Sequence, residues 1–156
     1  MSNAGTAPRP GQRGRLKVFL GAAPGVGKTL AMLQAGQMQL HQGVALRVGL
    51  VVPHDAASEA LLASLPQQPP RRGAGHGAEL DLDGLLADPP QLTLIAELAH
   101  ANPPGSRHAR RWQDVQELLA AGIDVYTTLS TERGWTPDRI EEWWGEALAR
   151  ELLTRT

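Results

Sequence analysis

The amino-acid sequence predicts an α/β fold in which helices flank a mainly parallel β-sheet. Short apolar segments of strand length alternate along the chain with longer segments of helical length, an order typical of parallel strands joined by crossover helices. The first apolar segment leads directly into a glycine-rich turn. Two predicted helices stop at a glycine, Gly43 and Gly122. In such a fold, ligands are expected at the carboxyl ends of the strands.

Each predicted element has its own sequence signal. The predicted strands are apolar and partly β-branched, and they cover residues 16–20, 44–52, 92–96 and 123–128. The predicted helices between them cover residues 27–42, 57–65, 80–87 and 109–121. Proline and glycine mark a loop at 67–77 and a turn at 102–105. A last helix is expected from Thr136, because Thr136-Pro137 is a favourable helix start and apolar residues then repeat every three or four positions.

Length and composition favour one domain, residues 15–156, preceded by a flexible tail at 1–14. The net charge of −1 argues against electrostatic binding to nucleic acid. The chain has no cysteine, which excludes disulfides and cysteine-based zinc sites. No apolar run approaches the roughly 20 residues of a membrane span, and the N-terminus lacks the apolar core of a signal peptide. We therefore expect a cytoplasmic domain without direct membrane insertion.

The turn after the first predicted strand reads Gly-Ala-Ala-Pro-Gly-Val-Gly-Lys-Thr, residues 21–29. A strand, such a turn and a helix in this order form a phosphate-binding P-loop, in which backbone N–H groups and the helix N-terminus face the phosphates. The strict motif has a glycine at the position that Ala22 occupies. Alanine is small enough for that position, so the sequence predicts a relaxed P-loop and a three-layer sandwich of the P-loop NTPase type.

This P-loop predicts a nucleotide or phosphate ligand together with Mg²⁺. Lys28 is expected to reach the β- and γ-phosphates, and the hydroxyl of Thr29 is expected to ligate Mg²⁺. The expected nucleotide contacts are Ala22, Gly25, Val26, Gly27, Lys28 and Thr29.

A nucleotide-hydrolysing P-loop protein needs a second carboxylate at the end of an apolar strand, where it helps to hold Mg²⁺. Here the strand at 92–96 ends in Ala96, and Glu97 follows. Strand alternation places these two side chains on opposite faces, so Glu97 replaces the missing aspartate only with a local bulge. Glu97 is the candidate catalytic residue, and a simple loop carboxylate is the alternative. His54 and Thr128 also follow predicted strands and are expected at the same edge.

A basic cluster, Arg107, His108, Arg110 and Arg111, lies between the third predicted strand and the next helix. One interpretation is an arginine that senses phosphate or stabilises a transition state, with Arg107 and His108 as candidates. A second is a docking surface for an acidic partner. The third is a solvated helix start whose basic residues pair with nearby aspartates and glutamates.

Four stretches make the chain resemble the N-terminal cytosolic domain of the KdpD family, the potassium-responsive sensor histidine kinases. They are residues 21–29, Glu-Leu-Ala-His-Ala-Asn at 97–102, Pro-Gly-Ser-Arg-His at 104–108 leading to Arg-Trp-Gln-Asp at 111–114, and Ala-Gly-Ile-Asp-Val-Tyr-Thr-Thr at 121–128. The resemblance implies a regulatory ATP-binding domain in two-component signalling, which controls expression of a potassium pump. It also implies a histidine kinase core or a response regulator as partner.

Two departures from the family pattern bear on function. The family has Asp-Glu-Leu-Ala-His where this chain has Ala-Glu-Leu-Ala-His at 96–100, and Glu-Thr-His-Gly-Arg where this chain has Val-Pro-His-Asp-Ala at 52–56. The sequence also shows no histidine kinase catalytic domain, so we expect at most a weak ATPase. A short stand-alone homologue and an excised fragment both fit this pattern.

The sequence leaves three functions open. The first is a regulatory ATP-binding module with weak or no hydrolysis, because the phosphate cradle is intact while Ala96 replaces the metal-binding aspartate. The second is an active P-loop NTPase or small-molecule kinase that uses Glu97. The third is a protein-interaction domain with a vestigial P-loop.

Overall fold

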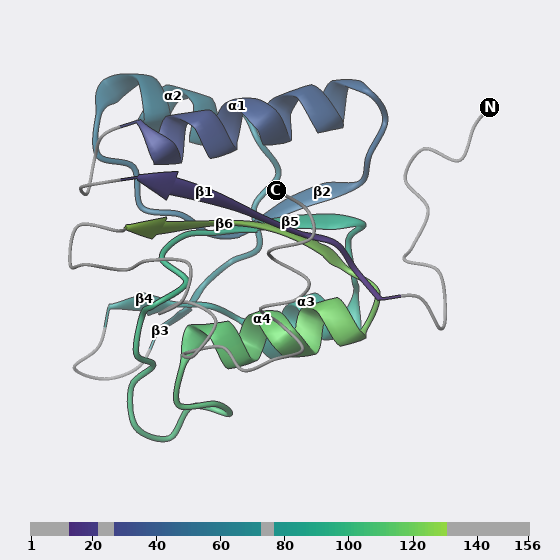
Figure 1. Cartoon of the computed structure of the whole chain (residues 1–156), viewed down its shortest axis with the longest axis vertical. Helices are drawn as coiled ribbons and strands as arrows, with labels where there is room; N and C mark the ends of the chain where they lie inside the picture. The colour runs from purple at the N-terminus through teal and green to yellow at the C-terminus, as the bar shows by residue number, and fades with distance from the viewer. Residues whose placement is uncertain (1–12, 22–26, 73–76, 131–156) are drawn as a thin grey trace.

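The computed structural model describes residues 13–21, 27–72 and 77–130, and these form a mainly parallel sheet with helices on both faces (Figure 1). In chain order the elements are β1 (Leu16–Gly21), α1 (Lys28–His41), β2 (Leu46–Leu50), α2 (Ala56–Ala63), β3 (Arg71–Arg72), β4 (Ala78–Glu79), α3 (Leu82–Ala87), β5 (Leu92–Ile95), α4 (Arg111–Ala120) and β6 (Asp124–Ser130). Helices α1 and α2 cover one face, and α3 and α4 cover the other (Figure 1). The predicted α/β architecture is confirmed. None of the helices in these ranges is long and apolar enough to cross a bilayer.

Four strands form the main sheet in the order β1-β6-β5-β2, and all neighbouring pairs are parallel. Strand β6 therefore lies between β1 and β5. In the β1–β6 pair, Leu16 is opposite Val125 and Gly21 is opposite Ser130. Because parallel strands point the same way, the carboxyl ends of β1, β5 and β6 meet at one edge of the sheet. That edge is where the sequence analysis expects the ligand.

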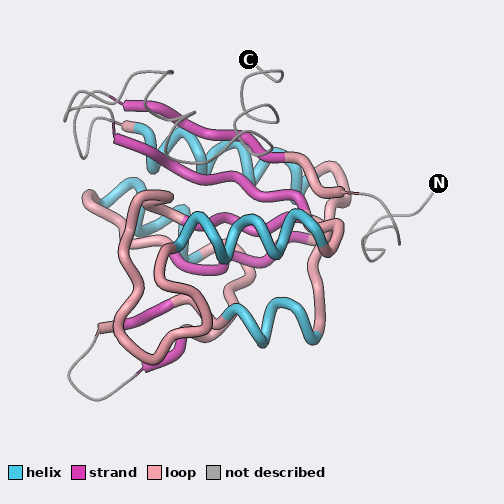
Figure 2. Tube along the Cα trace, turned by 60° about the horizontal axis from the view of Figure 1, so that its bottom comes forward, coloured by secondary structure: helices cyan, strands magenta, loops and turns pink. Residues whose placement is uncertain are grey.

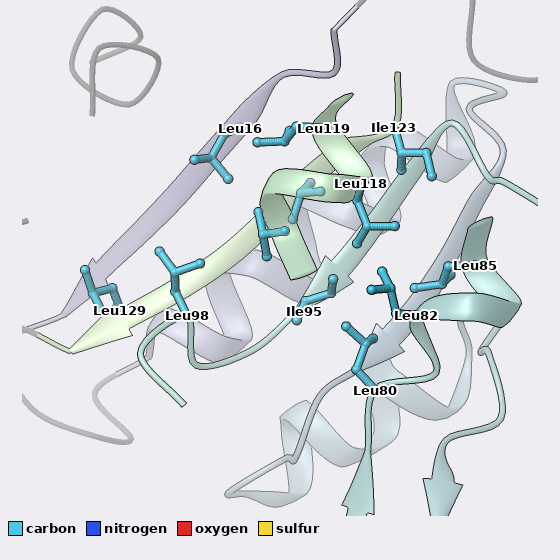
Figure 3. Close-up of a cluster of buried hydrophobic side chains, with 12 residues drawn as sticks. Leu16, Leu80, Leu82, Leu85, Ile95, Leu98, Leu118, Leu119, Ile123 and Leu129 are labelled. Atoms are coloured by element: carbon cyan, nitrogen blue, oxygen red, sulfur yellow. The ribbon is translucent and has the colours of Figure 1, made fainter. Parts of the chain in front are cut away.

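The sheet is buried on both faces, which explains why its strands are almost continuously apolar. One hydrophobic cluster lies on the α4 side and contains Ile95 of β5 and Leu118 of α4 (Figure 3). A second cluster lies on the α1 side and contains Leu94 of β5 with Met32 and Leu33 of α1. Neighbouring residues of β5 thus pack against opposite helix layers, as strand geometry requires.

The helix ends follow local signals. Helix α1 stops before Gly43, which has a φ of 92°, and α4 stops before Gly122, which has a φ of 89°. Both predicted glycine stops are confirmed. Helix α2 begins after Asp55, whose carboxylate accepts a hydrogen bond of 2.7 Å from the Ser58 N–H. This hydrogen bond to the ionised carboxylate lowers the pKa of Asp55.

Gly14, just ahead of β1, packs closely against the end of α4 and against Ile123, which lies between α4 and β6. Its N–H donates to the Leu119 carbonyl at 2.7 Å. A Cβ atom at Gly14 would lie 1.9 Å from the carbonyl oxygen of Ile123. Only glycine fits this approach of two backbones, so the entry into β1 depends on it.

The stretch 67–77, predicted as a loop, contains one strand of a small second sheet, and the prediction was wrong at Arg71–Arg72. Strand β3 pairs antiparallel with β4, apart from the main sheet (Figure 2). Strands of two residues are too short to show alternation, and proline and glycine surround this one, so the sequence carries no strand signal there. The predicted strand at 44–52 is also too long, since β2 covers Leu46–Leu50. The helix predicted from Thr136 lies outside the described residues.

Candidate functional site

Lys28 and Thr29 are the first two residues of α1, which begins at the edge of the sheet where β1 ends (Figure 1). Gly27 precedes them with a φ of 90°, a left-handed conformation that favours glycine. The helix has no side-chain cap at Gly27 and no acidic residue in its first turn. Among the described residues, no side chain caps this helix end, which carries a partial positive charge that favours an anion. The contacts predicted at Ala22, Gly25 and Val26 lie outside the described residues.

The side chains of Lys28 and Thr29 are uncommitted. Within the described part of the chain, neither makes a hydrogen bond or an ion pair. Thr29 is nevertheless buried, with 8% of its surface exposed. A buried hydroxyl without a protein partner has one donor and two lone pairs to offer a ligand. The arrangement suits a phosphate at Lys28 and a cation at Thr29.

Glu97 lies just beyond β5, in a left-handed backbone conformation with a φ of 60°. The strand ends at Ile95, one residue earlier than predicted. The Glu97 N–H donates to the Thr128 hydroxyl at 2.8 Å, and the Leu98 N–H donates to the Thr128 carbonyl at 2.9 Å. The expectation that Glu97 continues the strand alternation is therefore wrong, because the chain turns there. Its side chain is exposed at the carboxyl edge of the sheet.

Thr128 belongs to β6, because the strand continues through Ser130, and it is buried. The strand predicted at 123–128 ended at Thr128, and this boundary was wrong. The neighbouring Thr127 is buried as well, and its hydroxyl has no hydrogen-bond partner among the described residues. The two adjacent threonines therefore differ: Thr128 supports the turn at Glu97, and Thr127 does not.

The spacing of the strands sets the distance between the two candidate regions. Strand β6 separates β1 from β5, and neighbouring strands lie about 4.8 Å apart, so the ends of β1 and β5 are about 10 Å apart. Glu97 makes no hydrogen bond or ion pair with its carboxylate within the described residues. Burial lowers the pKa of Arg111, and the negative charge of Glu97 opposes part of that lowering.

Arg111, the first residue of α4, is a buried cation. Only 4% of its side chain is exposed, and desolvation lowers its pKa. Its Nη1 donates to the Ala96 carbonyl at 2.8 Å, and its Nη2 contacts Glu79 Oε1 at 3.3 Å. Arg111 was predicted only as part of the basic cluster, and its buried role was not predicted from the sequence. A polar residue at a mainly apolar helix position was the available signal, since Val115 and Leu118 share its face.

Arg107 and His108 do not face the start of α1 but pair with acidic residues beside α3 and α4. Arg107 contacts Asp83 at 2.7 Å and also contacts Glu117, and His108 Nε2 lies 2.8 Å from Glu117 Oε1. Arg110 is exposed, and its backbone N–H donates to the Gln113 side chain at 2.9 Å. The contacts of Arg107 and His108 are those of the third interpretation, in which the basic residues pair with nearby acids.

The loop that carries these residues is closed by Asn102. Its side-chain amide donates to the His108 carbonyl and to the Asp114 carboxylate, both at 2.9 Å. Its backbone N–H donates to the Ala109 carbonyl at 2.9 Å. Burial raises the pKa of Asp114. Asn102 and Asp114 are thus used to hold the loop in place.

A cavity of about 340 Å³ lies between this loop and the small sheet. Its lining includes Arg71 and Arg72 of β3, Glu79 of β4 and residues 103–106. The side chains of Arg71 and Arg72 are exposed, and neither side chain makes a hydrogen bond or an ion pair within the described residues. The small sheet of β3 and β4 lies on the same side of the main sheet as α3 and α4, whereas α1, which begins with Lys28 and Thr29, lies on the opposite side (Figure 1). The cavity is therefore separate from the candidate phosphate site.

The fold and the edge together define an α/β domain with a parallel sheet and a helix start suited to an anion. The chain belongs to the family described as "KdpD: Osmosensitive K+ channel His kinase sensor domain", whose model matches residues 12–133. This confirms the family resemblance.

Curated relatives agree with this assignment. The chain is 51% identical over 124 residues to "Sensor protein KdpD" of Escherichia coli (strain K12), covering 77% of this chain and 14% of the relative. It is 45% identical over 125 residues to "Sensor protein KdpD" of Mycobacterium tuberculosis, covering 78% of this chain and 14% of the relative. It is 44% identical over 130 residues to "Putative sensor protein KdpD" of Synechocystis sp., covering 81% of this chain and 35% of the relative. The chain thus spans a minor part of these relatives.

Proposed function

We propose that this domain binds ATP with Mg²⁺ as a cytoplasmic regulatory module of a KdpD-type potassium sensor, with weak or no hydrolysis. The observation that carries the proposal is the start of α1. Lys28 and Thr29 follow a left-handed Gly27, and both side chains are uncommitted within the described residues. The helix end beside them has neither a side-chain cap nor an acidic residue in its first turn. These features favour phosphate binding.

In this proposal each group has a separate task. The backbone N–H groups of the turn and of the first turn of α1 bind phosphate oxygens, which needs no side-chain chemistry. Lys28 adds a positive charge at the β- and γ-phosphates, and the Thr29 hydroxyl ligates Mg²⁺. The metal, when bound, neutralises phosphate charge. Because these contacts do not involve β5, they are independent of the missing aspartate.

Weak hydrolysis follows from Ala96. This residue is 6% exposed and belongs to the hydrophobic cluster on the α1 side. Its methyl group offers Mg²⁺ no oxygen, and its carbonyl already accepts the Arg111 hydrogen bond. The cation therefore lacks the second carboxylate that hydrolysing P-loop proteins use. Nucleotide occupancy can then act as the signal instead of turnover.

A second candidate, an active P-loop NTPase or small-molecule kinase, is favoured by Glu97. A glutamate with positive φ is uncommon, and strained backbone conformations cluster at functional sites. Glu97 is exposed at the same edge as the start of α1. Its carboxylate makes no hydrogen bond or ion pair within the described residues, so it can hold a water molecule or a water-bound cation. Under this candidate, Glu97→Gln abolishes phosphate release.

The family also suggests a partner. The relatives are named sensor proteins, and a sensor of this kind acts through a histidine kinase core or a response regulator. We propose that nucleotide binding at this domain alters the balance between kinase and phosphatase activities of such a core. No nucleic acid takes part in this proposal.

A titration of ATP with and without Mg²⁺, combined with a phosphate-release assay, tests the proposal on the purified chain. The chain has two lysines, Lys17 and Lys28, so Lys17→Ala is a matched control for Lys28→Ala. Lys17 lies on β1 with its Nζ 5.2 Å from the ring centre of Phe19. We expect binding without substantial release, lost in Lys28→Ala and kept in Lys17→Ala. If the chain does not bind ATP at millimolar concentration, the function that remains is a protein-interaction domain with a vestigial P-loop.

A further inference from the structure

Glu97 has a backbone conformation that its residue type does not favour. The other described residues with positive φ are glycines, at Gly27, Gly43, Gly105 and Gly122. A Cβ atom makes the left-handed region costly for any residue except glycine, with asparagine and aspartate as partial exceptions. A glycine at 97 would relieve the strain. The surrounding structure must therefore hold Glu97 in place.

Two side chains hold the peptide group that joins Ala96 to Glu97. Its carbonyl oxygen accepts a hydrogen bond of 2.8 Å from Arg111 Nη1. Its N–H donates a hydrogen bond of 2.8 Å to Thr128 Oγ1. Both polar atoms of one peptide are thus fixed by side chains from other elements, α4 and β6. With both atoms fixed, the peptide plane cannot rotate to relieve the positive φ of Glu97.

Both of these side chains are buried, so the contacts are shielded from water. Arg111 is 3% exposed and Thr128 is 1% exposed. A buried arginine pays for desolvation, and Arg111 Nε has no hydrogen-bond partner among the described residues. Backbone ladder bonds would satisfy the same peptide without a buried charge. An arrangement that is costly twice, in backbone strain and in charge burial, points to a requirement at Glu97 itself.

We propose that Thr128 and Arg111 are positioning residues that fix where Glu97 presents its carboxylate at the nucleotide edge. The inference rests on the proposed nucleotide site, since the carboxylate is positioned toward a water molecule or cation at the bound phosphates. Neither residue touches the nucleotide in this proposal. They act only through the peptide that they hold.

The first experiment measures the turn itself and needs no nucleotide. Hydrogen exchange of the Glu97 amide is followed by NMR in Thr128→Val, which keeps the shape of the side chain and removes its acceptor. We expect exchange about tenfold faster, the loss of one hydrogen bond. Thr128→Ser restores the hydroxyl and the protection. Thr127→Val is the matched control, because the Thr127 hydroxyl is unpartnered in the described structure, and it leaves the Glu97 amide unchanged.

The second experiment measures the coupling to function. The Mg²⁺ concentration that gives half-maximal ATP binding is determined for Thr128→Val, Glu97→Gln and the double variant. We expect each single variant to raise this concentration, and the double variant to resemble Glu97→Gln, because Thr128 acts through Glu97. Arg111→Lys is expected to raise the same Mg²⁺ concentration by a smaller factor. Arg110→Lys, at an exposed residue, is its control. Thr128→Ser restores the wild-type value.

Two results overturn the inference. One is a Glu97 amide whose exchange is unchanged in Thr128→Val. The other is a full additional effect of Thr128→Val in the Glu97→Gln background, which shows that Thr128 acts on its own. If ATP fails to bind the wild-type chain, the proposed function fails and the inference fails with it, although the exchange experiment still reports whether Thr128 holds the turn.

Discussion

Two regions with basic residues stand out in the sequence, the start of α1 and the loop before α4. Their basic side chains differ in whether they contact acidic residues. At the start of α1, Lys28 has no ion pair within the described residues, and the helix end beside it has no acidic neighbour in its first turn. In the loop before α4, Arg107 contacts both Asp83 and Glu117, and His108 contacts Glu117 as well. The first region keeps its charge available for a ligand, and the second uses its charge within the fold.

When a binding residue and a structural residue both lie in distinctive motifs, the contacts that each makes in the fold distinguish them. A motif shows that particular residue types recur together, but it does not show what they contact. A cation that is already paired with two carboxylates must lose those contacts before it can bind an anion. A cation without such partners can bind an anion without first losing an ion pair. The comparison therefore favours Lys28 over Arg107 as the phosphate ligand.

The largest expected effect tests the comparison directly. We expect Lys28→Ala to lower ATP affinity about 100-fold, because a charge-assisted contact to phosphate is worth about 2 to 3 kcal/mol. Arg107→Ala is expected to leave ATP affinity unchanged. Calorimetric titration of the two variants measures both. Equal losses in the two variants would show that Arg107 reaches the nucleotide and would remove the distinction.

The next effect sharpens the account of the α1 region. We expect Ala96→Asp to tighten Mg²⁺-dependent ATP binding about tenfold, about 1.4 kcal/mol, by restoring an oxygen ligand for the metal. Without ligand the same variant should be less stable, because Ala96 is buried in the cluster on the α1 side. Titrations at several Mg²⁺ concentrations measure the change in ATP binding, and thermal unfolding measures the loss of stability. An unchanged Mg²⁺ dependence would show that the metal lies elsewhere.

A smaller effect is expected in the loop. Arg107 is half exposed, so its ion pair with Glu117 should contribute less than about 1 kcal/mol to the free energy of unfolding. A double-mutant cycle with Arg107→Gln and Glu117→Gln measures it, and ATP affinity serves as the second readout. His108 also contacts Glu117, so Glu117→Gln should cost more stability than Arg107→Gln. The reverse order would contradict the shared role of Glu117.

The smallest expected effect is a dependence on pH. Burial raises the pKa of Asp114 above its ordinary value of 3.8, so its stabilising contribution is present below that value and is lost as the pH rises through the folded pKa. Asp114→Asn should therefore gain stability relative to wild type as the pH rises from the acid range to neutrality. Asp55 has the opposite sign, because the Ser58 N–H lowers its pKa. Urea unfolding across pH tests both slopes.

Much of the fold could be predicted because its signals are local. The order of strands and helices follows from apolar segments and their lengths, and the ends of α1 and α4 follow from Gly43 and Gly122. The small sheet at Arg71–Arg72 could not be predicted, since two residues show no period. The bounds of β5 and β6 were each wrong by one or two residues, because hydrogen bonding to a neighbouring strand decides where a strand ends.

The residues of the candidate site likewise fall into those that local patterns predicted and those that they did not. Lys28 and Thr29 were found from the order of strand, glycine-rich turn and helix, which is a local pattern. Arg111 was assigned to the basic cluster, and its buried side chain contacts Glu79, which lies 32 residues earlier in the chain. No local pattern reports a contact over that distance.

The α/β class, the family and the candidate residues at the start of α1 could all be recognised from the sequence, because periodicity, glycine stops and motif spacing are features of short stretches of the chain. Only the tertiary structure decided which charges stay available. It placed Arg107 against Asp83, 24 residues away, and it brought the Thr128 hydroxyl to the Glu97 N–H, 31 residues away. The physical reason is that hydrogen bonds and ion pairs depend on distances between atoms, and folding sets those distances for residues far apart in the chain.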